Sequence, residues 1–380
     1  MSLEKFFHLK ENNTTVKTEI MAGVTSFMTM AYILAVNPNI LAAAGMDHGA
    51  VFTATAVASF IGTLCMALFA NYPFALAPGM GLNAYFAYTV VLGMGYSWEV
   101  ALAAVLTEGI IFIILSCFNI REAIFNAIPF NLKKAVSVGI GLFITFLGLQ
   151  NAKIVIGGAT LVGLFSVDGY NKTLADGLTA SMSDAGITVL LAIFGVLITG
   201  ILIVKNVKGN ILWGILITWI LGIICQFAGI YIPNPDLGFY NLLPDFSNGI
   251  SIPSLAPIMF KFSLKGVPVL EFIVIVFAFL FVDLFDTLGT LIGVSAKADM
   301  LDSEGRLPRI KGALLADAVG TTCGACLGTS TVTTFVESAS GVTEGGRTGL
   351  TSLTTGILFL LSLFLSPIFL AIPSFATAPA

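Results

Sequence analysis

Two aspartates three residues apart, Asp283 and Asp286, lie within the apolar stretch 267–296. On a helix this spacing places both carboxyl groups on one face. A carboxylate inside a membrane costs roughly 2.5–3.5 kcal/mol on insertion scales, so it marks a functional site by default. Because two close carboxylates in a low dielectric disfavour joint ionisation, we predict that one of them holds a proton at neutral pH, which would make the pair a natural coupling element. The alternative interpretation is a structural cap or an interhelical hydrogen bond.

A third acid, Glu337, follows the polar and β-branched stretch 327–334, where the sequence becomes helix-compatible. We predict that it lies at the start of a half-helix, whose first N–H groups have no partner within the helix. A ligand can accept from those groups while the carboxylate accepts from ligand N–H groups. A glutamate that only offsets the helix dipole is the alternative. Phe335 can stack on an aromatic ligand, and core packing fits a chain with 31 Phe equally well.

Asn83 lies in a second interrupted segment, residues 74–86. Pro78, Gly79 and Gly81 break any regular helix there, so we predict an extended piece followed by a half-helix. Irregular backbone at membrane depth survives only inside protein or beside a wet cavity, and matched discontinuous spans point to a carrier's binding site. The Asn83 amide carries both a donor and an acceptor for a ligand. A plain helix cap is the alternative.

The two interrupted segments match in position. Asn83 and Glu337 are 254 residues apart, and the same offset relates Tyr32 in the first apolar span to Asp286. Matched elements in two halves are the pattern of an inverted-repeat transporter.

Other reactive side chains favour structural roles. We predict that Glu108 and Asp317 hydrogen-bond neighbouring helices rather than a ligand. The pair Cys323-x-x-Cys326 has no second pair or His cluster beside it, so small buried residues are a better interpretation than a zinc or redox site. We therefore predict no metal and no cofactor.

The elements that must position these residues are membrane spans. The chain has 380 residues, of which 57% are hydrophobic and only 10% charged, against about 25% charged in soluble proteins. Several apolar runs are long enough to cross roughly 30 Å of hydrocarbon as helices. We predict an all-α polytopic protein whose segments inside the membrane are residues 19–36, 51–70, 74–91, 97–118, 133–150, 184–204, 209–231, 267–296, 312–326, 328–342 and 348–371.

Basic residues orient these spans. With the N-terminus inside, 13 of the 17 Lys and Arg residues fall in cytoplasmic segments, as the positive-inside rule requires. We expect a multi-pass protein of the inner, cytoplasmic membrane, with external loops at about 151–183 and 232–266. The N-terminal segment mixes acids, bases and Asn, which is unlike a signal peptide. No basic stripe suggests nucleic acid as a partner.

Four strings carry a family resemblance: residues 22–38, 77–84, 283–290 and 333–349. They resemble the adenine/hypoxanthine/guanine permeases, the purine branch of the nucleobase–cation symporter family, and the resemblance covers essentially the whole chain. It implies fourteen spans in two inverted halves of seven, with two discontinuous spans that each combine a short strand and a half-helix. Because members of the family look longer, we expect the last two or so spans to be missing here.

The resemblance also implies a division into domains. A core domain that holds substrate takes residues 1–118 (spans 1–4) and 267–371 (spans 8–11). A gate domain takes residues 119–266 (spans 5–7 with the external loops), and residues 372–380 begin its missing spans.

The function implied is proton-coupled uptake of a purine base by movement of core against gate, commonly as a homodimer, and no enzymatic activity. By motif match, Asp286 and Glu337 fall on the substrate-binding acids of the family and Asn83 on its third-span polar residue, whose amide matches a purine edge. Proton coupling would involve Glu337, Asp286 and Asp283. The partners are then the base, the proton and the lipid bilayer.

Two other function classes stay open. Sulfate and bicarbonate carriers share the implied fold and bind anions between half-helix N-termini. Acids at both Asp286 and Glu337 would repel an anion, which disfavours this class. A membrane prenyltransferase would use Asp283-x-x-Asp286 to hold Mg²⁺, but that chemistry usually needs a second acidic cluster on another helix, and none appears in the sequence.

Overall fold

The computed structural model describes residues 3–118, 130–158, 161–164, 181–234, 239–247, 249, 251–302 and 307–379. The chain divides into two compact units. The first unit comprises residues 1–141 and 252–366, and the second comprises residues 142–251 and 367–380. Arg121, Lys172 and Arg306, which contributed to the predicted orientation, lie outside the described residues, as does most of the predicted loop 151–183.

Long apolar helices form most of the first unit. They are α2 (Val16–Met30), α3 (Ile33–Ala43), α4 (His48–Phe69), α6 (Trp98–Cys117), α11 (Val269–Lys297), α12 (Ile310–Leu327) and α14 (Gly349–Leu361). Shorter elements of this unit are α1 (Leu3–Phe6) near the N-terminus and a 3-10 turn (Ser362–Leu365) after α14, and the unit ends at the first residue of α15 (Ser366–Leu370). The predicted first span 19–36 ends too early, because the helical segment continues to Ala43 through Pro38. Membrane helices tolerate proline because neighbouring groups satisfy the freed backbone.

Both interrupted segments have the predicted strand and half-helix. Strand β1 (Leu76–Pro78) leads through Gly79 into α5 (Met80–Ala84) and a π-helix (Tyr85–Gly93). Strand β4 (Val332–Thr334) leads into α13 (Ser338–Thr343). The strands pair antiparallel, with Ala77 opposite Thr333, so the two segments cross inside the protein. Gly79 permits this crossing, because a Cβ there would lie 2.6 Å from Cγ2 of Thr333.

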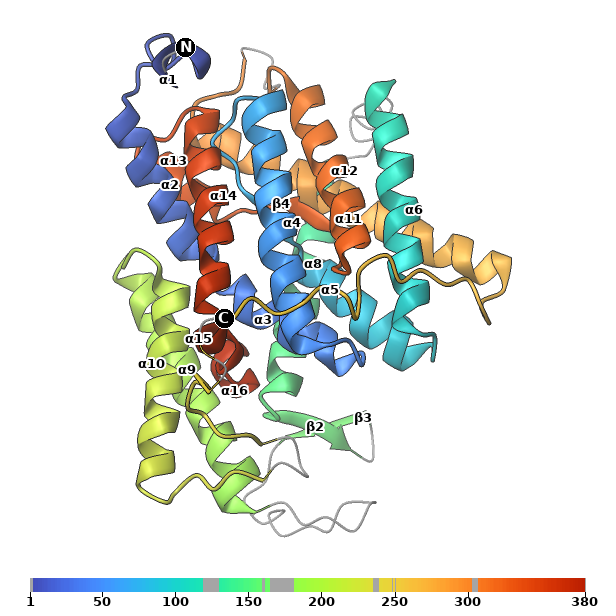
Figure 1. Ribbon diagram of the computed structural model, residues 1–380, viewed down its shortest axis with the longest axis vertical. Coiled ribbons are helices and arrows are strands. Elements are labelled where there is room, and N and C mark those ends of the chain that lie inside the picture. The colour runs from blue at the N-terminus through green and yellow to red at the C-terminus, as the bar shows by residue number, and fades with distance from the viewer. Residues whose placement is uncertain are drawn as a thin grey trace. The chain divides into compact units, whose positions relative to one another are not determined.

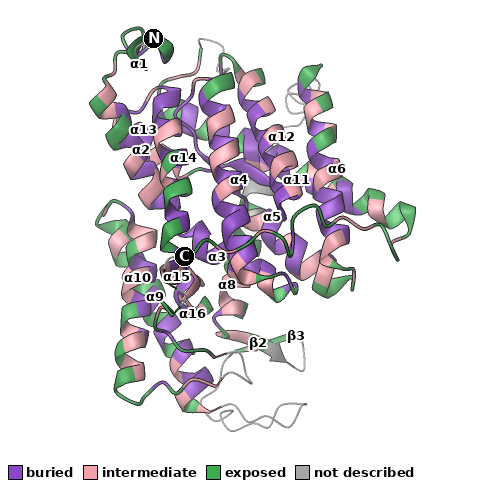
Figure 2. Ribbon diagram, in the orientation of Figure 1, coloured by how far each residue is buried: buried purple, intermediate pink, exposed green. Residues whose placement is uncertain are grey.

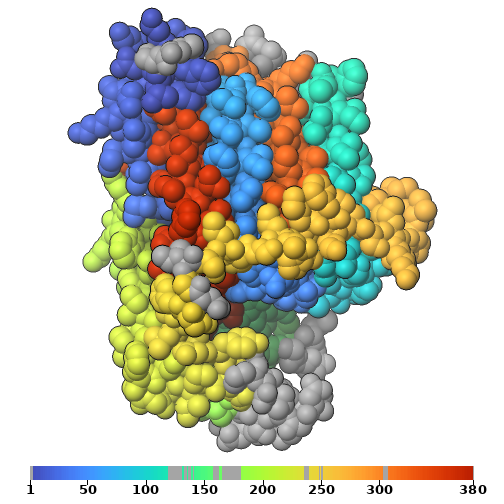
Figure 3. Space-filling view, viewed as in Figure 1, coloured from blue at the N-terminus to red at the C-terminus, as the bar shows by residue number. Residues whose placement is uncertain are grey.

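The order of elements in the first unit repeats. Helix α4 is followed by β1, α5 and α6, and helix α12 is followed by β4, α13 and α14. Helices α14, α4, α12 and α6 lie side by side across one face (Figures 1 and 3). Small residues allow the close approach, as at Gly349, where a Cβ would lie 2.5 Å from the Ala67 carbonyl oxygen.

The second unit contains two long helices, α9 (Ile187–Val204) and α10 (Asn210–Phe227), which pack against each other. A π-helical turn (Met182–Gly186) precedes α9, and α16 (Ser374–Thr377) contacts both helices. A hairpin of β2 (Val155–Gly158) and β3 (Leu161–Leu164) follows α8 (Phe130–Asn151), whose first half belongs to the first unit. Apolar residues such as Leu197 on α9 and Ile224 on α10 are exposed, and the ribbon in Figure 2 marks exposed and partly buried residues on both helices. Such faces need lipid as their solvent.

Seven helical segments in the described part of the chain are long and apolar enough to span a membrane. They are Val16–Ala43, His48–Phe69, Trp98–Cys117, Met182–Val204, Asn210–Phe227, Ile310–Leu327 and Gly349–Leu370. Each coincides with a predicted span, so the protein is a multi-pass membrane protein.

Candidate functional site

Glu337 lies at the junction between β4 and α13, where it is the N-cap residue of the half-helix, as predicted. Its carboxyl Oε1 accepts a 2.7 Å hydrogen bond from the hydroxyl of Tyr32, and its backbone carbonyl oxygen lies 3.4 Å from Oγ1 of Thr29. Tyr32 is buried at the junction of α2 and α3. The glutamate itself is half-buried. One carboxyl oxygen is therefore held by the first span, and the side chain keeps some accessible surface.

Asp286 faces the start of the other half-helix. It lies in the second half of α11 and is half-buried. Its Oδ2 lies 3.5 Å from the point where a Cβ on Gly79, the N-cap of α5, would stand. Helix α11, which carries Asp286, packs against α13, the half-helix that Glu337 caps. The structure thus brings together two acids from α11 and α13 with Tyr32 from the first span.

Asp283 lies one turn earlier on α11 and is fully buried. Its Oδ1 accepts a 2.9 Å hydrogen bond from Thr287, whose hydroxyl also lies 2.8 Å from Oδ1 of Asp317 on α12. The prediction that Asp317 bonds a neighbouring helix is confirmed. Although Asp283 and Asp286 share one side of the helix, only Asp286 retains accessible surface.

Asn83 is fully buried inside α5. Its Oδ1 accepts a hydrogen bond from the Ser330 hydroxyl, and its Nδ2 lies 3.4 Å from the Pro78 carbonyl oxygen. It does not cap the helix, because the N-cap of α5 is Gly79. The amide therefore links the start of α5 to the segment that precedes β4.

Phe335 is buried directly after β4, and its backbone N–H donates to the Ala75 carbonyl oxygen at 3.0 Å. This bond continues the strand pairing one residue toward Glu337. On the other side of β4, the Thr331 hydroxyl donates to Oε2 of Glu108 at 2.7 Å. Glu108 thus bonds the segment that directly precedes β4.

The described residues contain no group of three or more His, Cys, Asp or Glu side chains arranged to hold a metal ion. Two half-buried carboxyl groups, one of them held by a phenol, can accept N–H groups of a neutral ligand or take up a proton.

A family model named Xan_ur_permease and described as the Permease family matches residues 17–380. The chain belongs to this family. The permease is 40% identical to the adenine permease AdeP of Escherichia coli, over 100% of this chain and 78% of AdeP. It is 44% identical to the guanine/hypoxanthine permease PbuG of Bacillus subtilis, over 100% of this chain and 81% of PbuG. The resemblance drawn from the four sequence strings is confirmed.

Solved structures show the fold of the permease. The transmembrane domain of a cyanobacterial bicarbonate transporter, BicA, matches with a TM-score of 0.68 at 14% identity, covering 96% of this chain and 86% of that domain. At this identity the likeness concerns the fold alone, which is the predicted inverted-repeat transporter fold.

Sequence reasoning missed the hydroxyl groups that organise the site of the permease. Tyr32 entered only through the 254-residue offset, and Ser330, Thr331 and Thr333 were noticed only as part of a polar run. Ser330 bonds Asn83, Thr331 bonds Glu108 and Thr333 bonds Thr287, and these three partners lie on different helices. A cluster of hydroxyl residues in a membrane segment is a usable signal, because each buried hydroxyl needs a partner.

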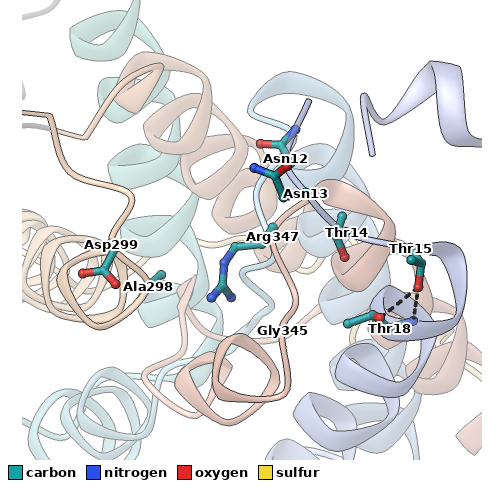
Figure 4. A pocket seen from close by; sticks show the side chains of 9 residues that line it. All are labelled: Asn12, Asn13, Thr14, Thr15, Thr18, Ala298, Asp299, Gly345 and Arg347. Carbon is teal, nitrogen blue, oxygen red and sulfur yellow. Dashed lines mark hydrogen bonds between the residues drawn. The ribbon is translucent and has the colours of Figure 1, made fainter. Parts of the chain in front are cut away.

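A surface pocket of about 470 Å³ lies elsewhere on the permease (Figure 4). It is lined by the segment before α2, including Asn12 and Thr15, together with Asp299 and Arg347. None of the site acids lines it. The Arg347 guanidinium donates to the Val342 and Gly346 carbonyl oxygens, so this arginine serves the end of α13.

Proposed function

We propose that the protein carries a purine nucleobase across the membrane together with a proton. The observation that carries the proposal is the placement of two half-buried acids on helices that pack against each other, Asp286 on α11 and Glu337 at the start of α13, with Tyr32 bonded to Glu337. Relatives named as adenine and guanine/hypoxanthine permeases, at 40% and 44% identity, support the substrate class.

Two neighbouring acids suit an uncharged base better than an anion. A purine offers ring N–H donors and, in adenine and guanine, exocyclic N–H₂ donors. An ionised carboxylate carries only hydrogen-bond acceptors, so it pairs with such donors. An anion beside Asp286 and Glu337 would be repelled by both. Although the fold also occurs in a bicarbonate transporter, the acids of this chain favour a neutral ligand.

In the proposed mechanism, Glu337 and Asp286 accept the N–H groups of the base, while Asn83 and Phe335 contribute a polar and an aromatic contact. A proton from outside binds one carboxyl group, with Asp283 nearby on the same helix. Neutralising that charge lowers the cost of moving the site through a low-dielectric barrier. Release of base and proton inside then resets the carrier.

We propose further that spans 1–4 and 8–11 form the moving core and that spans 5–7 and residues 372–380 belong to the gate. The charge distribution of the sequence supports a cytoplasmic N-terminus and an inner-membrane location. A homodimer is the expected assembly.

Uptake into proteoliposomes tests the function. The purified chain is reconstituted, a proton gradient, a sodium gradient or no gradient is imposed, and labelled hypoxanthine, guanine and adenine are followed. The proposal predicts accumulation driven by the proton gradient and abolished by a protonophore. Accumulation driven by sodium alone would refute proton coupling, and failure to bind any purine would refute the substrate class.

Binding to single variants tests the site. Glu337→Gln keeps the shape of the side chain but replaces the carboxylate, and loss of a hydrogen bond to a charged group costs about 1.5–3 kcal/mol. We therefore expect purine affinity to fall about 10- to 100-fold, with a changed pH dependence. The matched control is Glu344→Gln, a half-buried glutamate at the other end of α13. Equal affinities of Glu337→Gln and wild type would exclude Glu337 from the site.

A further inference from the structure

The hydroxyl of Thr287 joins three elements of the first unit. Its Oγ1 lies 2.9 Å from Oδ1 of Asp283 on the same helix and 2.8 Å from Oδ1 of Asp317 on α12. The same oxygen lies 2.7 Å from Oγ1 of Thr333 on β4. Thr287 and both aspartates are fully buried, and Thr333 is 1% exposed. Water is therefore unable to replace these contacts without opening the fold.

The hydrogen-bonding capacity of the Thr287 hydroxyl limits how many of the two aspartates can be ionised. A threonine hydroxyl has one proton to donate and two lone pairs to accept with. If Asp283 and Asp317 were both ionised, Thr287 could donate to only one of them, and the other would face an oxygen lone pair. The three contacts are satisfied together only when at least one aspartate carries a proton and donates it to Thr287. The geometry therefore indicates a proton held on the Asp283–Asp317 pair.

The charges around the pair favour the same state. Helix α11 packs against α5, α6, α13 and β4, and helix α12 packs against α4, α6, β1 and β4. The only Lys or Arg residues in these elements are Lys297, the last residue of α11, and Lys311, the second residue of α12. The acids that these elements contribute are Asp286 and Glu271 on α11, Glu99 and Glu108 on α6, and Glu337 and Glu344 at the ends of α13.

The other titratable groups on the elements packed against the pair are His48 and Cys65 on α4, Cys117 on α6, and Cys323 and Cys326 on α12.

Acids thus outnumber Lys and Arg on these elements, and buried charge is costly. A proton shared by Asp283 and Asp317 lowers the negative charge that the helices bury and leaves one negative charge for the Thr287 hydroxyl to stabilise.

We propose that Thr287 is a positioning residue that ties the crossing strand β4 to α11 through this proton-dependent contact. Thr333 is separated from Glu337 by only three residues, and Asp286 directly precedes Thr287. The hydroxyl therefore sets the distance between the two ligand-facing acids. Loss of the proton from the Asp283–Asp317 pair breaks one of the three contacts and loosens β4, so the position of Glu337 depends on a proton that does not touch the ligand.

This role rests on the proposed function only where purine binding is measured, so the test has two independent arms. In the first, Thr287→Val removes the hydroxyl and keeps the shape, and Thr287→Ser restores the hydroxyl. Thr321→Val is the matched control, because the Thr321 hydroxyl also ties α12 to β4, at 2.9 Å from the Val332 carbonyl oxygen, with no carboxyl group involved. We expect Thr287→Val to weaken purine binding about tenfold and to alter its pH profile.

In that arm Thr287→Ser should recover both properties, and Thr321→Val should keep the wild-type pH profile. Unchanged binding in Thr287→Val, or the same changed profile in Thr321→Val, would overturn the proposal. A purely structural role predicts that the two valine variants behave alike.

The second arm uses no purine. Infrared difference spectroscopy of the purified chain at neutral pH should show the C=O band of a protonated carboxyl group. The Asp286→Asn/Glu337→Gln variant should keep this band, and Asp317→Asn should lose it, because an amide at that position donates to Thr287 without a bound proton. Asp283→Asn serves the same purpose if Asp317→Asn does not fold, and Glu108→Gln should keep the band. Absence of this C=O band from the wild-type spectrum, or its loss when sodium is added, would contradict the proposal.

Discussion

Removing one oxygen from Tyr32 changes the candidate site with little change of shape. Tyr32 is 4% exposed, and its hydroxyl donates to Glu337 at 2.7 Å. In Tyr32→Phe the ring still fills its place, but the carboxylate loses the bond that fixes its orientation. Glu337 can then rotate and hydrate, which competes with binding of a ligand N–H group.

The size of the effect follows from the kind of bond. A hydrogen bond to a charged group contributes about 1.5–3 kcal/mol. Glu337 is half-buried, so water recovers part of this energy, and about 1–2 kcal/mol remains. That free energy corresponds to a purine affinity about 5- to 30-fold weaker than in the wild type.

Equilibrium binding of labelled hypoxanthine, guanine or adenine measures this change, with Tyr240→Phe as a control at an exposed tyrosine of the second unit. Because Tyr32 acts through Glu337, a double-mutant cycle should be non-additive, and adding Tyr32→Phe to Glu337→Gln should cost little more. Additive losses, or wild-type affinity in Tyr32→Phe, would refute the reasoning.

Two further predictions concern stability in detergent, followed by thermal unfolding. Glu19→Ala should destabilise the protein by about 3 kcal/mol, because this fully buried carboxylate accepts hydrogen bonds from Thr351 N and Oγ1 at the start of α14. Gly109→Ala should cost about 1–3 kcal/mol, because the added Cβ would lie 2.5 Å from Oγ1 of Thr322 on α12, whereas Gly139→Ala, with nothing within 4 Å, should be close to neutral. An unchanged unfolding temperature for Glu19→Ala or Gly109→Ala would contradict these assignments.

The membrane spans and both interrupted segments were predictable because their signals are local. Pro78 and Gly79 interrupt the span at the point where β1 ends and α5 begins. The pairing of Ala77 with Thr333 was not predictable, since no local rule relates residues so far apart in the chain. The end of the first span was also missed: α3 continues through Pro38 to Ala43, because a membrane helix tolerates an internal proline.

The acids of the candidate site could be proposed from the sequence because a carboxyl group in an apolar span is energetically costly, which marks it as a candidate functional group. Their partners were not identifiable, because partners depend on how distant helices pack. The spacing of Asp283 and Asp286 predicted a shared face, yet burial separates them. Asp283 accepts from the Thr287 hydroxyl, and Asp286 lies beside the start of α5. The family, by contrast, followed from the strings themselves, such as residues 333–349.

The most direct test of the central claim is a structure of the protein with a purine bound. The proposed function predicts the base between Asp286 and Glu337, with ring or exocyclic N–H groups within hydrogen-bonding distance of both carboxyl groups. A bound base elsewhere, for example in the surface pocket beside Arg347, with neither acid in contact, would contradict it.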